Sequence, residues 1–170
     1  MWDNFISFIG LVGTIGTIFA VLSAIVVTYW TIRGFLPVLL RLGYGLWRRK
    51  IAIIAVGDAY ENLEQLIKET RLFNSKNIVA VRGHGELEQA ASVDVLLVHW
   101  PDCNDFIDDI LDLKTAGKSL VVYAPPTGGR LPEDVMAKLE LRRNVVLNNF
   151  RGRLLNDIVS CLITTAYEKK

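Results

Sequence analysis

Two arginines stand at the start of the last predicted helix, in the stretch NNFRGRLLNDI at residues 148–158. Arg151 and Arg153 lie where a helix N-terminus already carries partial positive charge, so each opposes the helix dipole by roughly a few tenths of a kcal/mol. The arrangement becomes favourable when an anion lies in front of it, because phosphates bind at helix N-termini and arginine binds them bidentately. Alternatively, both arginines pair with acidic residues of a neighbouring subunit or of residues 102–112.

A histidine lies between two glycines in the GHG sequence at residues 83–85. A histidine that acts as a base or nucleophile needs an orienting partner, and the sequence does not place one. We therefore expect His84 to be structural, or to hydrogen-bond a ligand, rather than to act as a base. Trp100, at the end of a predicted strand, either stacks on a base or packs under a loop.

A run of aspartates resembles a catalytic carboxylate cluster. It consists of Asp102, Asp105, Asp108, Asp109 and Asp112. On a helix the last four form one solvated stripe, and Asp102 and Asp105 suit N-terminal capping and complement the helix dipole. We therefore favour a structural role and assign no catalytic residue. Cys103 and Cys161 lie far apart without a CxxC or Cys/His cluster, which predicts reduced thiols and no metal site.

Alternating strands and helices must position these side chains. Continuous apolar runs predict strands at residues 51–56, 77–82, 94–100, 119–124 and 144–149, and helices at about 61–73, 87–91, 101–117, 132–141 and 151–170. Strands without polar interruption are buried on both faces, which is typical of a parallel sheet covered by helices. Five such units predict an α/β domain with three layers, of flavodoxin-like type, and the strand order 2-1-3-4-5.

Ligands in such a fold bind at the carboxyl ends of the strands, near the switch point between the first and third strands. Those ends carry residues 57–58, 83–85, 99–102, 125–126 and 148–153. The predicted ligand-binding residues are Asp58, His84, Trp100, Asn149, Arg151 and Arg153.

The N-terminal segment carries no charge between Asp3 and Arg33, which exceeds the ~20 apolar residues that a spanning helix needs. The chain lacks the basic start of a secretory signal, so we predict a retained transmembrane helix over residues 1–32. Residues 1–50 have a net charge of +4, and all their basic residues follow the span. The N-terminus is therefore expected outside and residues 51–170 in the cytoplasm. The latter carry a net charge of −3, which does not suit a general nucleic-acid binder.

Residues 33–50, RGFLPVLLRLGYGLWRRK, are too short and too interrupted by glycine and proline for a second span. Arginines that alternate with leucines and aromatic residues suggest an amphipathic linker in the cytoplasmic interface. The alternative is that the first helix continues through this segment, tilted or kinked at Pro37. Residues 51–170 then form the cytoplasmic α/β domain.

Small and hydroxylic residues recur along the span at helical spacing. They are Ser7, Gly10, Thr14, Thr17, Ala24, Thr28 and Thr31, with Val21 in the same row; Gly13, Gly16, Ala20 and Ser23 form an adjacent face. Small residues let helices approach closely, and hydroxyls bond across an interface or line water. Two such faces suit a ring of several copies, so we predict a homo-oligomer and a pore. Alternatively, the hydroxyls bond back to their own backbone.

The order of elements, the phrase SVDVLLVHW at residues 92–100 and the compact final helix resemble TIR-like and receiver-like Rossmannoid domains over roughly residues 51–165. Receiver domains carry an acidic pair after the first strand, whereas Asp58 stands alone here, and no lysine follows the fifth strand. Catalytic TIR domains carry a glutamate in the helix after the third strand, and this helix offers only aspartates. Phosphorelay and NAD hydrolysis are therefore not expected.

A membrane helix fused to such a domain resembles the small membrane effectors of bacterial antiphage systems, including CBASS, membrane-linked CRISPR ancillary proteins and the Hailong system. The resemblance implies a single-pass protein of the bacterial inner membrane and a pore gated by a nucleotide or oligonucleotide from a partner nucleotidyltransferase. We expect no further cofactor and, since the receiver and TIR catalytic residues are not matched, no enzymatic activity. Residues 51–170 would then be a Rossmannoid sensor domain. The alternative is a membrane-tethered nucleotide-processing enzyme or protein-docking adaptor.

Overall fold

The computed structural model describes residues 2–128 and 130–168, and the chain divides into two units between Arg41 and Leu42. Helix α1 (Trp2–Arg48) contains Pro37, and the backbone is helical through residues 33–48. Within α1, the segment Gly13–Pro37 is long and apolar enough to cross a membrane. All side chains of this segment are exposed, as expected of a helix whose apolar surface is covered by something other than its own chain.

The second unit is built on a sheet of five parallel strands in the order β2-β1-β3-β4-β5. The strands are β1 (Ile51–Ile54), β2 (Ile78–Val81), β3 (Val95–His99), β4 (Ser119–Tyr123) and β5 (Val145–Asn148). In the central register Ile51 pairs with both Ile78 and Val95. The α/β class, the parallel sheet and the strand order are those predicted, because buried β-branched runs mark central parallel strands clearly.

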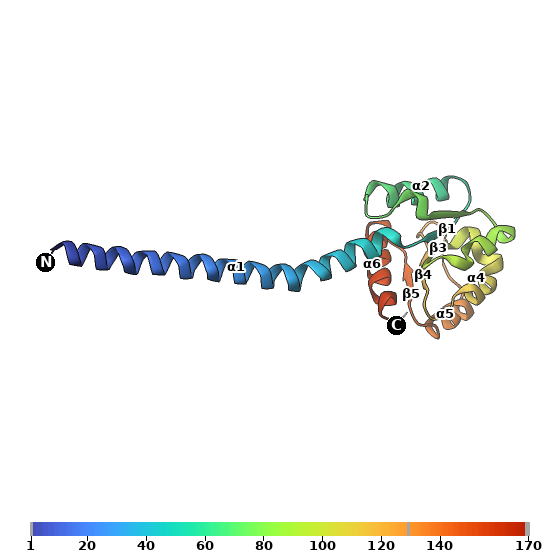
Figure 1. Ribbon diagram of the computed structural model, residues 1–170. Helices are drawn as coiled ribbons and strands as arrows, with labels where there is room; N and C mark the ends of the chain where they lie inside the picture. The colour runs from blue at the N-terminus through green and yellow to red at the C-terminus, as the bar shows by residue number, and fades with distance from the viewer. Residues whose placement is uncertain (1, 129, 169–170) are drawn as a thin grey trace. The chain divides into compact units, whose positions relative to one another are not determined.

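Helices cover both faces of the sheet, and Figure 1 shows the strands between α6 and the pair α4 and α5. Ala52 and Ile54 of β1 belong to one core cluster, with residues of η2 (His84–Ser92), α3 (Trp100–Cys103), α4 (Ile107–Leu113) and α5 (Glu133–Glu140). Ile51 and Ile53 belong to the other, with residues of α2 (Gly57–Glu69) and α6 (Arg151–Glu168). Side chains on a strand alternate between its two faces, so one short strand serves both clusters.

The helices differ from their predicted bounds in three places. α2 spans Gly57–Glu69, earlier at both ends than the predicted helix at about 61–73. It begins at Gly57, which has a φ of +55°, and ends before Arg71, which has a φ of +52°. The helix predicted over residues 101–117 is divided into α3, η3 (Asn104–Phe106) and α4, because the backbone departs from α-helical angles at Cys103 and Phe106. η2 is a 3-10 helix, longer than the predicted helix, and a further short 3-10 helix, η1 (Ser75–Asn77), precedes β2.

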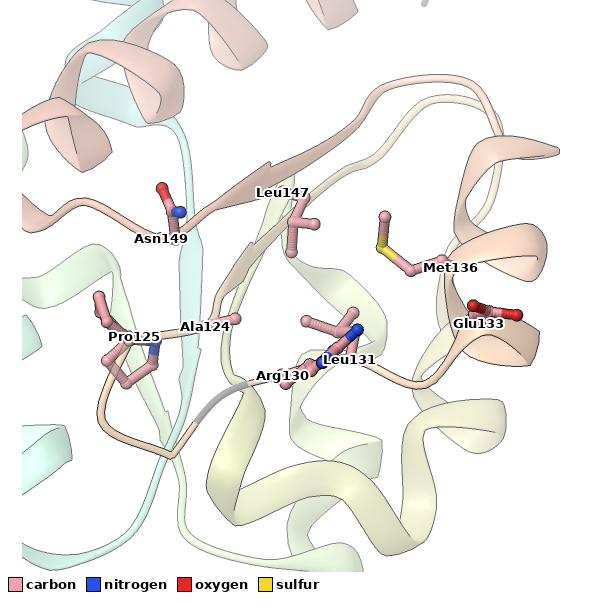
Figure 2. A pocket seen from close by; sticks show the side chains of 9 residues that line it. Ala124, Pro125, Arg130, Leu131, Glu133, Met136, Leu147 and Asn149 are labelled. Carbon is pink, nitrogen blue, oxygen red and sulfur yellow. The ribbon is translucent and has the colours of Figure 1, made fainter.

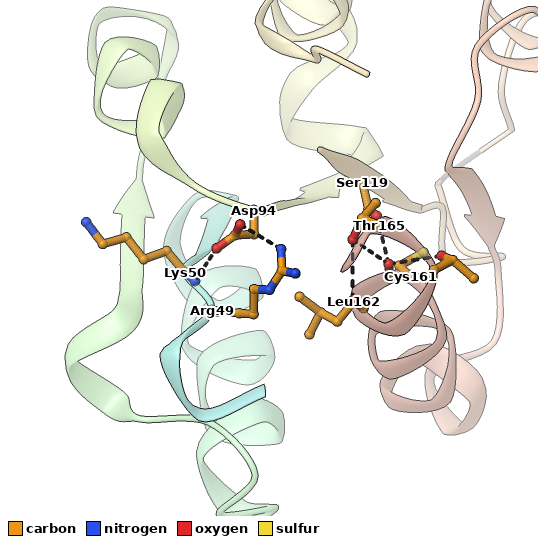
Figure 3. A network of polar contacts seen from close by, with 8 residues as sticks. Arg49, Lys50, Asp94, Ser119, Cys161, Leu162 and Thr165 are labelled. Atoms are coloured by element: carbon orange, nitrogen blue, oxygen red, sulfur yellow. Dashed lines mark hydrogen bonds and ion pairs between the residues drawn. The ribbon is translucent and has the colours of Figure 1, made fainter. Parts of the chain in front are cut away.

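Hydrogen bonds also join α6 to β4 in the second unit. Ser119 Oγ of β4 donates to the carbonyl of Cys161 in α6 at 3.2 Å, and within α6 Thr165 Oγ1 donates to the same carbonyl at 2.7 Å (Figure 3). Both hydroxyls are buried, so these bonds remove the cost of burying them unpaired. The Ser119 bond fixes the middle of α6 against the start of β4.

Candidate functional site

The carboxyl ends of β1 and β3 are joined by the side chain of Asp102. Its Oδ2 accepts a hydrogen bond from the backbone N–H of Val56 at 2.8 Å and lies 2.8 Å from Nδ1 of His99. A carboxylate only accepts, so Nδ1 of His99 carries the proton, and Nε2 of the neutral ring is an acceptor. Asp102 does not cap a helix, because α3 and η3 have no side-chain cap, but it lies in the first turn of α3, where an acidic residue complements the helix dipole.

A pocket of about 300 Å³ lies beside this junction and is called the switch pocket below. It is lined by Ala59, Asn62, Leu63, His99, Tyr123, Pro125 and Arg151. His99 and Tyr123 are register partners on β3 and β4, with ring centroids 5.9 Å apart and planes inclined by 38°. The pocket therefore combines an oriented imidazole, a phenol and a guanidinium at the carboxyl edge of the sheet, where parallel α/β folds bind ligands.

The loop before α6 holds Arg151 in place. Asn148 Oδ1 accepts a hydrogen bond from the backbone N–H of Phe150 at 2.7 Å, and Asn148 Nδ2 donates to Asp157. Gly152 allows the Phe150 ring to approach the first turn of the helix, because a Cβ at residue 152 would lie 2.8 Å from Cε1 of that ring. The Arg151 side chain reaches α2, where Nη2 donates to the carbonyl of Asn62 at 3.4 Å.

The remaining predicted ligand-binding residues are distributed around the domain. Arg153 is exposed on α6 and Asp58 is exposed in the first turn of α2, and neither belongs to the lining of the switch pocket. Asn149 lines a neighbouring hollow with Pro125. Of the two arginines, the structure thus brings only Arg151 to the predicted site.

His84 has a partner, Asp109, but lies in a separate hollow with Glu88 and Asp112. Its Nε2 is 2.9 Å from Asp109 Oδ2, and both side chains are more than half exposed. Exposed pairs of this kind are weakly held. The aspartates at 105, 108, 109 and 112 are all exposed, as expected of a solvated stripe.

Trp100 is 5% exposed and packs in the core cluster of α3 and α4. Its ring is therefore not available to stack on a base. Of the two roles expected from the sequence, Trp100 has the role of packing in the core. A large aromatic side chain at a strand end gains more from burial under the following helix than from contact with water.

No family model matches the chain, and no curated protein or solved structure matches it either. The chain is thus assigned to no enzyme family. Among residues 2–128 and 130–168, no group of three or more His, Cys, Asp or Glu side chains is placed to hold a metal ion.

The predicted interface residues share one face of α1, because steps of three and four return to the same side of a helix. Gly10, Thr14, Thr17, Ala24, Thr28 and Thr31 are exposed, and Ser7 lies outside the residues whose side chains the structure describes. Thr14, Thr17 and Thr31 donate to the carbonyls of Gly10, Gly13 and Val27 at 2.8, 2.9 and 2.8 Å. These hydroxyls therefore bond to their own backbone, which leaves lone pairs on their oxygens as acceptors.

Asn62 and Tyr123 were not singled out from the sequence. Asn62 lies in the middle of α2 and lines the switch pocket because of the side of the helix on which it stands. Only the packing of α2 against the sheet decides which side that is. Tyr123 ends a buried strand and looks like a core residue, yet it is only half-buried. A polar aromatic residue at the carboxyl end of a strand is the one local signal that could have found it.

Proposed function

We propose that this chain is an oligomeric, single-pass membrane effector whose α/β domain binds a nucleotide or oligonucleotide signal in the switch pocket. The strand order and the resemblance described above support a flavodoxin-like or TIR-like sensor domain. The observation that carries the proposal is Arg151 beside His99 and Tyr123 at the carboxyl ends of β3 and β4. Binding of the signal controls a pore formed by the N-terminal helices.

The choice of a phosphate-bearing ligand follows from charge. Arg151 begins α6, so its guanidinium and the partial positive charge of the helix N-terminus act on the same region. His99 and Tyr123 add groups that hydrogen-bond phosphate or sugar oxygens, and the pocket volume of about 300 Å³ is at the small end of ligand sites. A partner nucleotidyltransferase is the proposed source of the signal.

The membrane part of the proposal rests on α1. At the cytoplasmic end of its apolar segment, Arg33 Nη1 donates to Tyr29 Oη at 3.0 Å, and the guanidinium carbon lies 5.9 Å from the centroid of the same ring. Aromatic and arginine side chains of this kind anchor a helix at the interface. The small and hydroxylic face then packs against neighbouring copies, with the threonine oxygens turned to water in the pore.

Ligand binding is tested with the full chain in detergent micelles. ATP and cyclic di-AMP serve as probes, and binding is measured by isothermal titration calorimetry and thermal shift. We expect Arg151→Ala to weaken binding by about tenfold or more, since a charge-assisted hydrogen bond is lost. Lys76→Ala removes one exposed positive charge from η1, at the amino end of the sheet, and should leave binding unchanged.

The pore is tested by ion flux in proteoliposomes and by cross-linking of the reconstituted protein. Thr17→Leu should abolish flux and leave assembly intact, because it places an apolar side chain on the hydroxylic face. Val26→Leu is the matched control, since Val26 lies on the opposite side of α1 by helical geometry. Normal flux in the Thr17→Leu variant contradicts the pore. Turnover of the ligand without ion flux favours the alternative, a membrane-tethered enzyme. In that case His99, oriented by Asp102, would be the candidate imidazole for the reaction.

A further inference from the structure

A second hollow, of about 570 Å³, lies on the carboxyl side of β4 and β5 and is called the β4–β5 hollow below. Its lining includes Arg130, Leu131, Glu133, Met136, Leu147 and Asn149 (Figure 2). The volume lies within the ~300–1,000 Å³ of small-molecule sites. Of the residues that line the hollow, only Asn149 is among the ligand-binding residues predicted from the sequence.

The β4–β5 hollow adjoins the switch pocket. Pro125 lines both of them, and Asn149 and Arg151 stand two residues apart on the segment that leads into α6. Ala124 N–H donates to the carbonyl of Asn148 at 2.8 Å, which holds the two strand ends together between the compartments. The hollow lies on the α5 face of the sheet and the switch pocket on the face of α2 and α6, so one ligand occupies both by crossing the carboxyl ends of β4 and β5 at Pro125.

The two compartments differ in chemistry. Leu131, Met136 and Leu147 converge across the β4–β5 hollow from the loop before α5, from α5 and from β5 (Figure 2). Leu147 remains 41% exposed although it lies on a strand of the sheet, so α5 leaves apolar strand surface uncovered here. Arg130, Glu133 and Asn149 add polar groups to the lining. An apolar lining with a few donors and acceptors suits a planar heterocycle.

We infer that the β4–β5 hollow binds the base of a nucleotide whose phosphate lies at Arg151 in the switch pocket. The inference rests on the proposed function, because it takes the phosphate site from it. The base places its faces against Leu131, Met136 and Leu147, and its polar edge meets Asn149 and Glu133. Arg130 adds a second positive charge, and charge complementarity thus favours a phosphorylated ligand over an uncharged one of the same shape.

The test compares AMP, GMP, UMP and CMP with ribose 5-phosphate, which has the phosphate but no base. Binding to the full chain in detergent micelles is measured by isothermal titration calorimetry. We expect at least one nucleotide to bind roughly tenfold or more tightly than ribose 5-phosphate, from burial of the ring. Leu147→Gln and Met136→Gln should each remove this difference and leave ribose 5-phosphate binding unchanged.

Leu141→Gln is the matched control, because Leu141 is 87% exposed and outside the hollow. It should bind every probe as the unmodified chain does. Arg151→Ala should weaken the nucleotides and ribose 5-phosphate alike. Equal binding of all five probes, unaffected by Leu147→Gln, overturns the base site and leaves phosphate binding standing. If none of the five binds, the proposed function fails and the base site fails with it.

Discussion

The carboxylate of Asp94 lies 2.8 Å from Nη1 of Arg49, and its other oxygen accepts a hydrogen bond from the backbone N–H of Lys50 at 3.0 Å (Figure 3). Both side chains are more than four-fifths buried. The backbone N–H of Asp94 in turn donates to the carbonyl of Lys50 at 2.9 Å. These bonds join the residues that follow α1 to the start of β3, at the edge of the sheet opposite the switch pocket.

Replacement of Asp94 should destabilise the α/β domain. Asp94→Ala leaves the Arg49 guanidinium mostly buried without its carboxylate, and we expect the free energy of unfolding to fall by about 2 kcal/mol. Chemical denaturation followed by tryptophan fluorescence measures the change. Asp105→Ala, an exposed aspartate of the same charge, is the control and should cost under about 0.5 kcal/mol. Equal effects of the two substitutions would contradict the role given to Asp94.

The point at which α1 is cut should change the stability of the α/β domain. A chain of residues 42–170 keeps Leu46, which packs against the core of α2 and α6, and Trp47, whose carbonyl accepts from Asn77 Nδ2 at 2.8 Å. A chain of residues 51–170 loses these contacts and Arg49. We expect it to unfold at lower denaturant concentration, with a free energy lower by roughly 2–4 kcal/mol. Coincident denaturation curves for the two chains would sink this prediction.

The two cysteines should be unreactive in the folded protein. Burial, with a smaller contribution from Asp102, raises the pKa of the Cys103 thiol to about 12, and burial raises the pKa of Cys161. The Cys103 thiolate fraction at neutral pH is then on the order of a thousandfold below that of an ordinary thiol. Iodoacetamide labelling followed by mass spectrometry should modify both residues only after unfolding. Rapid labelling of the native protein would contradict the assigned burial.

The same pKa shift predicts a loss of stability at alkaline pH. The folded state holds the Cys103 proton from its ordinary pKa of 9.0 up to about 12, whereas the unfolded chain releases it. The unfolded state therefore binds fewer protons in this window, and the free energy of unfolding falls as pH rises. Cys103→Ala should flatten this fall between pH 9 and the highest measurable pH. An unchanged slope would show that other groups dominate, among them Tyr60, whose pKa is raised by burial to about 12.

The Asp102 carboxylate should control the tautomer of His99. Asp102→Ala removes the acceptor of both the His99 Nδ1 proton and the Val56 N–H, and we expect a stability loss of about 1–2 kcal/mol. Nitrogen NMR of the imidazoles should show the Nδ1-protonated form of His99 decreasing in this variant. Asp109→Ala is the matched control, because it removes the exposed partner of His84 and should leave the His99 signals unchanged. A His99 spectrum insensitive to Asp102→Ala is the opposing result.

Local patterns were sufficient for the strands, and the repeated alternation of strands and helices was sufficient for their order. The runs at 51–54, 95–98 and 119–122 are buried on both faces, and such runs are central parallel strands whatever their neighbours are. Helix bounds were predicted less well. The predicted helix is divided into α3, η3 and α4 so that Trp100, Cys103 and Ile107 can each reach the core. Local helix propensity does not predict such breaks.

The sequence by itself determined an apolar N-terminal helix, a parallel α/β domain and Arg151 at a strand end, because hydrophobic periodicity and helix start signals are local. Only the tertiary structure decided which of these residues meet. Asp102 reaches Val56 across 46 positions of sequence, and Arg151 reaches Asn62 across 89. Such pairs depend on how strands far apart in the chain become neighbours, and on the side on which each helix crosses. Packing determines the strand neighbours and the helix sides together, because every helix must cover apolar strand surface on one of the two faces of the sheet.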